Sequence, residues 1–435
     1  NVAVGAFALD ANTTSGNLTA VGYNALGGNT TGTENTGIGR QALLTNSTGS
    51  YNVALGVNAL YQNTTADYNT ACGNSALAAN TTGADNTAIG ASALDACTTG
   101  SNNTAGGVNA LGAMTTGGHN TAFGKGAGDA ITTASHNSAF GSHSLGSNTT
   151  GAYNTAVGRE SLFTNTTASN NTAIGYQSML NNTTGTENAA GGGYALYANT
   201  TGSYNTAFGY ASLSTITTAS NSSAFGYRAL GANTSGAAND AFGFNSLRLN
   251  TTGDYNSAFG NSALYSNTTG NKSTAVGYYA LVSATTGGNN TAVGYRTLDS
   301  CTDGHDNTAV GRDALGDVST GEKNTALSTA GQAITTGQNN MCLGYNAGSS
   351  ASPSGNITTG NNTICLGDNS ISNLYCNDTS ISSSDSRDKT DINDFTKGLD
   401  WIKALRPVTY RWDRRTWYGT DDTPLGIPDG SKKRT

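Results

Sequence analysis

The sequence predicts an all-β fold, a parallel β-solenoid (β-roll) built from 17-residue repeats. The first observation is a glycine that returns once in every repeat without a slip from Gly5 to Gly311, 19 times in all. The second is that apolar and small residues recur at fixed positions between these glycines. Such a strict period indicates one structural unit stacked on the next. At about 4.8 Å per turn the 19 turns would extend about 90 Å, so we expect a rod.

The composition excludes several classes of protein. With 59 glycines and 11% charged residues the chain could be disordered, but a disordered segment would not keep a fixed period. Residues 1–383 carry 9 basic and 18 acidic residues, so no basic stripe is available for nucleic acid. No signal peptide or apolar run of membrane-spanning length is visible, and no membrane insertion is expected. Because the sequence opens inside a repeat and without methionine, we expect it to be a piece of a longer protein.

We number each repeat so that the glycine is position five: Asn-Thr-Ala-x-Gly-x-x-Ala-Leu-x-x-Asn-Thr-Thr-Gly-x-x. Position four is apolar in 17 of 19 turns, with Gly106 and Gly191 as exceptions. Position nine is leucine in 17 turns, with Gly128 and Met179 as exceptions. The pattern predicts that positions four and nine form the two interior stacks of the solenoid.

Position three is alanine in every turn but one, Gly37, and position five is always glycine. Side chains alternate along a strand, so these positions should lie opposite to position four, on the outer face. Small residues there would let a second backbone approach closely, which predicts an oligomer packed along this Ala/Gly face. Alternatively, the glycine only provides a turn with positive φ, which would not account for the alanines. The glycines singled out as structural are Gly22, Gly39, Gly56, Gly73 and Gly90.

Position twelve is asparagine in 12 of the first 18 turns, including the structural candidates Asn29, Asn46, Asn63 and Asn80. Each opens an Asn-x-Ser/Thr triplet, which could accept a glycan. The exceptions are cysteine, methionine, isoleucine and alanine, which favour an inward position. We therefore expect an internal ladder in which each amide donates to the neighbouring turn. The asparagines of position one, such as Asn35, are expected to support the turn that enters the strand.

Nothing in the repeats predicts catalysis, a metal site or a cofactor. Tyrosines at position six, such as Tyr23, could stack on carbohydrate or could simply be scattered on the surface. His119 and His136 lie one turn apart without nearby carboxylates, which is a weak metal signal. Cys72, Cys97 and Cys301 are expected to be buried free thiols, and the carboxylates form no pair of the kind that glycoside hydrolysis needs.

Beyond Gly311 the register decays. Ser328 replaces the expected glycine, and the stretch Ala351–Gly355 predicts a loop inserted into the last turns. We therefore expect residues 1–327 to form the shaft and residues 328–383 to form degenerate repeats and a neck.

The sharpest motif follows in residues 384–435. Ser384-Asp385-x-Arg387-x-Lys389 precedes Leu405-Arg406-Pro407-Val408-x-Tyr410. This segment resembles the endosialidase-type intramolecular chaperone found at the C-terminus of phage tail spikes and fibres. The resemblance implies the N-terminal part of a small α+β domain that directs trimerisation and then cleaves itself after the motif serine.

Carried over to this chain, Ser384 would be the nucleophile, Lys389 the base and Ser384–Asp385 the cleaved bond, with Arg387 in the motif. A polar turn with an incidental lysine is the alternative. Within the segment, residues 398–405 predict a short amphipathic helix and residues 408–412 an alternating strand.

The rod is also similar in architecture to the heads of trimeric autotransporter adhesins. Together the two resemblances imply a homotrimeric tail or capsid fibre on a virion surface, outside the cell. Its partners would be other virion proteins and a host surface glycan or protein receptor. The alternatives are a cellular trimeric surface adhesin, a polysaccharide depolymerase, and an ice-binding solenoid, the last suggested by the threonines of positions two and thirteen.

Overall fold

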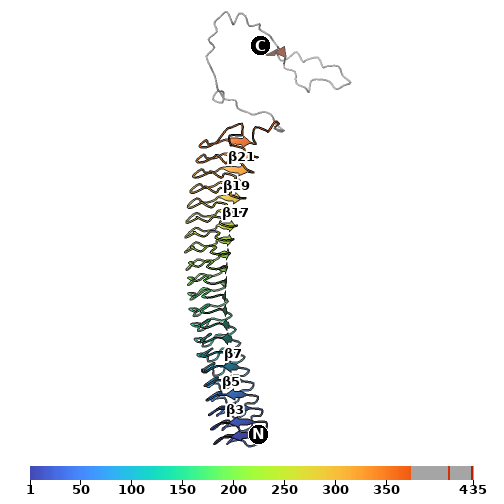
Figure 1. The fold of residues 1–435 in the computed structure, drawn as a ribbon, viewed down its shortest axis with the longest axis vertical. Coiled ribbons are helices and arrows are strands. Elements are labelled where there is room, and N and C mark those ends of the chain that lie inside the picture. The colour runs from blue at the N-terminus through green and yellow to red at the C-terminus, as the bar shows by residue number, and fades with distance from the viewer. Residues whose placement is uncertain (374–409, 412–432, 435) are drawn as a thin grey trace, which may run out of the picture. The chain divides into compact units, whose positions relative to one another are not determined.

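The computed structural model describes residues 1–373, 410–411 and 433–434. The chain divides into two compact units, Asn1–Ser372 and Asn373–Thr435. The first unit is a parallel β-solenoid of 17-residue turns, which confirms the predicted fold class (Figure 1). The described residues contain no helix, and therefore none that could cross a membrane. The predicted helix of residues 398–405 lies outside the described residues.

Each turn of the solenoid contributes one three-residue strand to a 22-stranded parallel sheet. Neighbouring strands pair in register at the repeat spacing, so that Thr19 lies opposite Thr36 and Val21 opposite Ile38. The strands are β1 (Val2–Val4), β2 (Thr19–Val21), β3 (Thr36–Ile38), β4 (Val53–Leu55), β5 (Thr70–Cys72), β6 (Thr87–Ile89), β7 (Thr104–Gly106), β8 (Thr121–Phe123), β9 (Ser138–Phe140), β10 (Thr155–Val157), β11 (Thr172–Ile174), β12 (Ala189–Gly191), β13 (Thr206–Phe208), β14 (Ser223–Phe225), β15 (Asp240–Phe242), β16 (Ser257–Phe259), β17 (Thr274–Val276), β18 (Thr291–Val293), β19 (Thr308–Val310), β20 (Thr325–Leu327), β21 (Met341–Leu343) and β22 (Ile364–Leu366). In the second unit, β23 (Tyr410–Arg411) pairs antiparallel with β24 (Lys433–Arg434).

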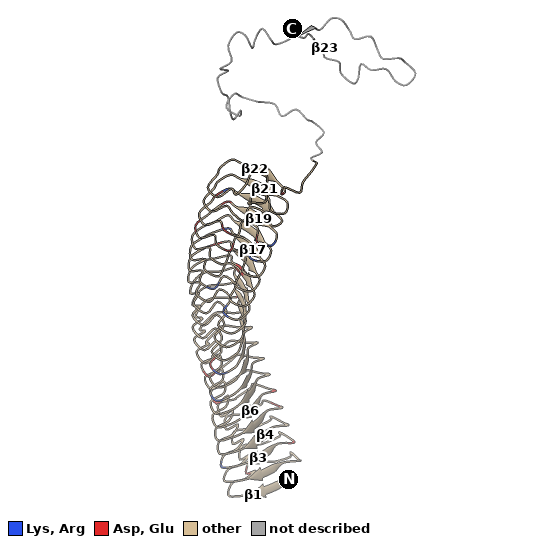
Figure 2. Cartoon of the chain, turned by 45° about the horizontal axis from the view of Figure 1, so that its top comes forward, with Lys and Arg blue, Asp and Glu red and all other residues tan. Residues whose placement is uncertain are grey.

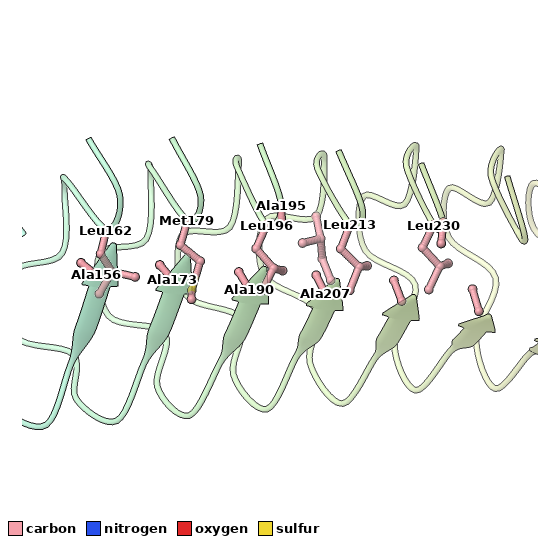
Figure 3. Packing of buried hydrophobic residues seen from close by; sticks show 14 of the residues in the cluster. Ala156, Leu162, Ala173, Met179, Ala190, Ala195, Leu196, Ala207, Leu213 and Leu230 are labelled. Atoms are coloured by element: carbon pink, nitrogen blue, oxygen red, sulfur yellow. The ribbon is translucent and has the colours of Figure 1, made fainter. Parts of the chain in front are cut away.

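The interior of the solenoid is lined by alanine from position three and leucine from position nine. Ala20 and Leu26 are both fully buried, and the same holds along the rod. Figure 3 shows the leucines of successive turns, such as Leu196 and Leu213, lying against the strand alanines Ala190 and Ala207. A 17-residue turn encloses a narrow space, which is occupied by the leucine of position nine and the inward residue of position twelve, so the strand contributes only a methyl group.

The predicted interior stack at position four is therefore wrong. Because Ala20 points inward, the alternation along the strand directs position four outward. Ile38, for example, has 41% of its surface exposed. The predicted outer Ala/Gly face, and chain packing along it, are wrong for the same reason. The stack at position nine is correct.

The glycine of position five has two structural reasons. Gly22 has φ +138°, a conformation that other residues rarely adopt, so the alternative of a positive-φ turn is correct. A Cβ on Gly22 would also lie 2.4 Å from the carbonyl oxygen of Gly39. A second backbone does approach closely, but it is the next turn of the same chain.

Two exceptions in the sequence are compensated within their own turn. Gly128 replaces the leucine of position nine, and a Cβ there would lie 2.9 Å from Cδ1 of Ile131, which occupies position twelve. Gly331 and Ile334 repeat this exchange near the end of the rod, where Ile334 Cδ1 would lie 3.3 Å from such a Cβ. The large side chain thus enters the core from position twelve when position nine lacks one.

The last turns change length without leaving the sheet. Thr325 in β20 pairs with Met341 in β21, and Met341 pairs with Ile364 in β22, so the first of these turns is shorter than the repeat and the second is longer. The additional residues lie between Gly348 and Ile357 and include the predicted Ala351–Gly355 loop. The solenoid accommodates an insertion here because the loop lies outside the strand pairing.

Candidate functional site: an apolar face on the strands

The outward side chains of position four form one continuous surface, which we call the apolar face. It consists of Val4, Val21, Ile38, Leu55, Cys72, Ile89, Gly106, Phe123, Phe140, Val157, Ile174, Gly191, Phe208, Phe225, Phe242, Phe259, Val276, Val293, Val310, Leu327, Leu343 and Leu366. All of them are exposed or half-buried, with Ile174 46% and Phe123 42% exposed. Scattered exposed apolar residues are ordinary, but a contiguous row along a whole rod marks an interaction surface.

The surroundings of the apolar face are nearly free of charge. Position two, which points the same way on each strand, is mostly threonine or serine, and Asp240 is the one charged residue at positions two and four of β1–β22. Figure 2 shows the charged residues of the solenoid thinly scattered, with no band of either sign along the strands. The face therefore suits contact with another weakly charged, apolar surface.

The phenylalanines of the apolar face stack on one another in two runs. In the longer run, Phe225 stacks on Phe242 and Phe242 on Phe259, each with ring centroids 4.8 Å apart. Both runs begin after a glycine at position four. A Cβ at Gly106 would lie 2.4 Å from Phe123 Cδ1, so the ring lies over the preceding turn. The glycine exceptions of position four thus provide room for the first ring of each run.

The asparagines predicted at position twelve lie inside the solenoid and form the expected ladder. Nδ2 of Asn46 donates to Oδ1 of Asn29 at 2.7 Å, and Asn63 donates to Asn46 at 2.8 Å. Each amide also donates to the backbone of the same turn, as Asn46 does to the carbonyl of Gly49 at 2.8 Å. These side chains are fully buried, so they offer no acceptor for a glycan in the folded chain.

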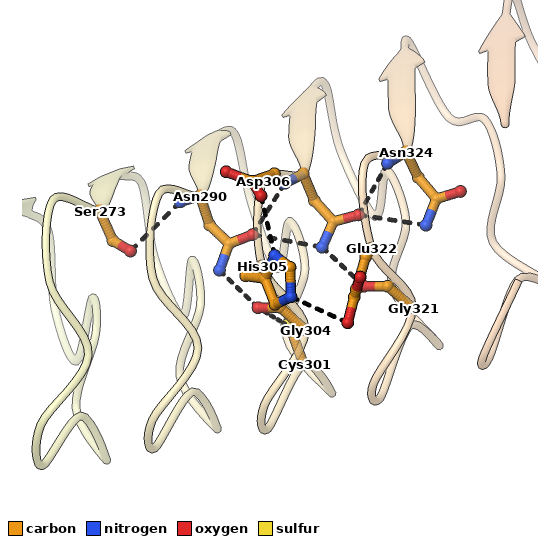
Figure 4. A network of polar contacts seen from close by, with 10 residues as sticks. Ser273, Asn290, Cys301, Gly304, His305, Asp306, Gly321, Glu322 and Asn324 are labelled. Atoms are coloured by element: carbon orange, nitrogen blue, oxygen red, sulfur yellow. Dashed lines mark hydrogen bonds and ion pairs between the residues drawn. The ribbon is translucent and has the colours of Figure 1, made fainter. Parts of the chain in front are cut away.

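A second ladder runs through position one and was missed from the sequence. The side-chain oxygen of Asn35 accepts the backbone N–H of Asn52 at 2.9 Å, and Nδ2 of Asn35 donates to the carbonyl of Gly49 at 2.7 Å. Figure 4 shows the same arrangement near β18, where Asn290 N–H donates to the hydroxyl of Ser273. The near-invariance of position one was the available signal, because a turn-supporting surface residue would vary more.

The remaining polar groups of the solenoid form local contacts and no catalytic arrangement. His305 bridges Asp306 and Glu322, each at 2.8 Å (Figure 4). The rings of His119 and His136 stack with centroids 4.9 Å apart. In the described part of the chain, no group of three or more histidine, cysteine or acidic side chains could hold a metal ion.

The cysteines of the solenoid fall into buried and exposed groups. Burial raises the pKa of Cys97 to about 11 and that of Cys301 to about 12, so both thiols stay protonated near neutral pH. The expected burial is correct for these two thiols and wrong for Cys72, which is exposed because it stands at the outward position four. The apolar face thus carries one natural thiol.

The motif residues Ser384, Asp385, Arg387 and Lys389 lie outside the described residues, and the structure assigns no geometry to them. β23 (Tyr410–Arg411) falls within the predicted strand of residues 408–412. No curated protein is significantly similar to the chain. Residues 384–429 match the family model described as the chaperone of endosialidase, a self-cleaving chaperone domain, so a β-solenoid rod and a chaperone-like segment share one fibre-like chain.

Proposed function

We propose that this chain is a structural homotrimeric fibre of a virion, a tail or capsid fibre that attaches to a host surface. Its C-terminal segment would act as the trimerisation chaperone. One observation carries the proposal: a rod with an uncovered apolar face is followed in the same chain by a segment that matches the chaperone of endosialidase. The apolar face gives the rod a reason to assemble, and the chaperone gives it a means.

The repeat itself explains why such a rod needs a chaperone. A shift of one copy by a single repeat places position four of one turn against position four of the next, so alternative registers differ little in free energy. A domain at one end that trimerises first would select one register before the rods pack. A rod with irregular turns would need no such help.

Host attachment would use the variable, outward positions of the turns. Aromatic rings are stacked there in short rows, such as Tyr210 on Tyr227 at 5.7 Å and Tyr227 on Phe244 at 5.3 Å. Exposed aromatic faces of this kind suit stacking against sugar rings of a surface glycan, and the same rows could contact a protein receptor. Other virion proteins would hold the fibre in place.

Self-cleavage would release the chaperone once the trimer has formed. In this proposal Lys389 removes the proton from the Ser384 hydroxyl, whose oxygen attacks the carbonyl of the Ser384–Asp385 bond. The proton passes to the amine of Asp385 as it leaves, and water hydrolyses the resulting ester to a carboxylate on Ser384. A lysine serves as base only when burial lowers its pKa. Intact-mass measurement of the purified chain tests this step. We expect a fragment ending at Ser384, which a Ser384→Ala variant does not produce.

The assembly is tested by sedimentation equilibrium of the full chain. The Ser384→Ala variant, in which the chaperone segment stays attached, should have three times the 43.9 kDa mass of one chain. The mass of a single chain at micromolar concentration would overturn the proposed trimeric fibre.

A further inference from the structure

We infer that the apolar face is the contact surface between three copies of this chain, which run parallel and in the same register. Equivalent turns then meet around a common threefold axis. This inference rests on the proposed trimer and names its surface, direction and register.

The size of the face fits an interface between copies. Twenty-two strands at about 4.8 Å extend roughly 100 Å, and a row of side chains about 8–10 Å wide then covers roughly 800–1,000 Å². Three such faces would together bury roughly 2,400–3,000 Å², which is in the range of permanent assemblies, whereas soluble monomers rarely expose a patch of more than a few hundred Å². The face is therefore larger than a solitary rod would leave in water.

A second copy is the partner that can follow the face along its whole length. The strand direction turns progressively about the rod from β3 to β19 (Figure 1), so the face winds around the solenoid. A globular protein could cover only a few turns of it. Another copy of this chain has the same 17-residue pitch and the same winding, and three copies would coil about one another.

The direction and register follow from the two ends and from the phenylalanines. The chaperone match at residues 384–429 lies at one end of the sequence, and only a parallel arrangement places three such segments together. A cyclic arrangement places each residue near its own equivalents. In register, the run from Phe208 to Phe259 meets the same run in each copy. A shift of one repeat sets only the end rings against Gly191 or Val276, so the phenylalanines favour the matched register slightly and the chaperone selects it.

Cys72 allows a direct test of this geometry, because it is the exposed thiol of the apolar face and lies between Leu55 and Ile89 one turn away on either side. In parallel, in-register copies the Cys72 thiols lie beside one another at the axis. In an antiparallel or shifted arrangement each Cys72 faces a different residue.

The experiment is oxidative cross-linking of the full chain, with copper phenanthroline as catalyst and dissolved oxygen as electron acceptor. The chain carries Cys376→Ser, which removes the cysteine that lies outside the described residues. Two thiols lose two protons and two electrons to form each disulfide. We expect a covalent dimer on a non-reducing gel that reaches at most two thirds of the chains, because one thiol in each trimer has no partner. A matched control carries Cys72→Ser and Thr65→Cys, which moves the thiol to an exposed position of the neighbouring turn, off the apolar face; it should not cross-link.

The outcomes separate this inference from the proposed function. Cross-linking through Cys72 but not through Thr65→Cys supports the inference. A protein that sediments as a trimer but does not cross-link through Cys72 overturns the inferred interface and leaves the trimer intact. Equal cross-linking of both variants, or Cys72 cross-linking well above two thirds, also contradicts it. A monomeric mass overturns both.

Discussion

Cys97 lies one turn beyond Asn80, at the position where a further asparagine would continue the ladder, and the side-chain oxygen of Asn80 consequently has no hydrogen-bond partner in the described solenoid. The same holds for Asn199, before Ile216, and for Asn267, before Ala284. Each run of asparagines thus ends in one buried, unpaired carbonyl oxygen. The free-energy penalty of a buried asparagine ladder therefore depends on how many ends it has more than on how many asparagines it contains.

Cutting a ladder in the middle should therefore cost more than shortening it. Asn63→Ala creates a new unpaired oxygen on Asn46 and leaves the one on Asn80, whereas Asn80→Ala only moves the unpaired oxygen to Asn63. We expect Asn63→Ala to lower the free energy of unfolding by about 1–3 kcal/mol more than Asn80→Ala. Denaturant unfolding of the two variants measures this difference, and equal losses would contradict the ladder.

The adjacent residues Gly192 and Gly193 differ in whether the backbone requires a glycine. Gly192 has φ +125°, and a Cβ there would lie 2.7 Å from the carbonyl oxygen of Gly209. We expect Gly192→Ala to destabilise the fold by more than about 2 kcal/mol. Gly193→Ala is the matched control, since its Cβ would meet Tyr210 at an ordinary 3.6 Å. It should be neutral in the same denaturant titration, and equal losses for both would refute the backbone argument.

A charge on the apolar face should weaken assembly, whereas a charge on another exposed position should not. Ile174 at position four is 46% exposed and Tyr204 at position seventeen is 56% exposed, so either lysine would be tolerated by an isolated rod. We expect Ile174→Lys to shift the sedimentation profile from trimer toward monomer at micromolar concentration. Tyr204→Lys should leave the profile unchanged. If both variants remain trimeric, the apolar face is not the contact surface.

The repeat length, the all-β fold class and the leucine core could be predicted from the sequence. In a stack of identical turns each side chain lies on the equivalent side chain of the next turn, so its residue type recurs at a fixed spacing. The direction of the strand side chains could not be predicted in this way. Both positions accept few residue types: position four is apolar and position three is alanine in most turns. The usual rule that bulky apolar residues lie inside predicts that position four points into the core. The narrow interior reverses that rule, since Leu26 and the inward Asn29 already occupy the turn and Ala20 is all that the strand can add.

The two asparagine positions differ in how clearly their substitutions show that the side chain points inward. The exchange of asparagine for Ile131 or Ile216 revealed that position twelve points inward, because isoleucine is rarely exchanged with a surface amide. Position one gave one such exchange, Leu18, which is buried; its other substitutes in the regular repeats are serines such as Ser222 and Ser273, which suit a surface as well as a core. The near-invariance of position one and the single Leu18 were the available signals, because the serine substitutions by themselves do not distinguish a buried ladder from a surface turn.

Alkaline pH should destabilise the solenoid through its buried thiols. Burial raises the pKa of Cys301 to about 12, above the ordinary value near 9, so the folded chain keeps a proton that the unfolded chain loses. The stabilisation is complete below about pH 9 and is lost as the pH rises toward 12, at up to about 1.4 kcal/mol per pH unit. The free energy of unfolding should thus fall by up to about 2 kcal/mol between pH 9 and pH 10.5 on account of Cys301.

Cys301→Val should remove this part of the decline, and the fully buried Val318 one turn later shows that position twelve accepts valine. Identical slopes for Cys301→Val and the wild type would show that this thiol titrates alike in the folded and unfolded chains.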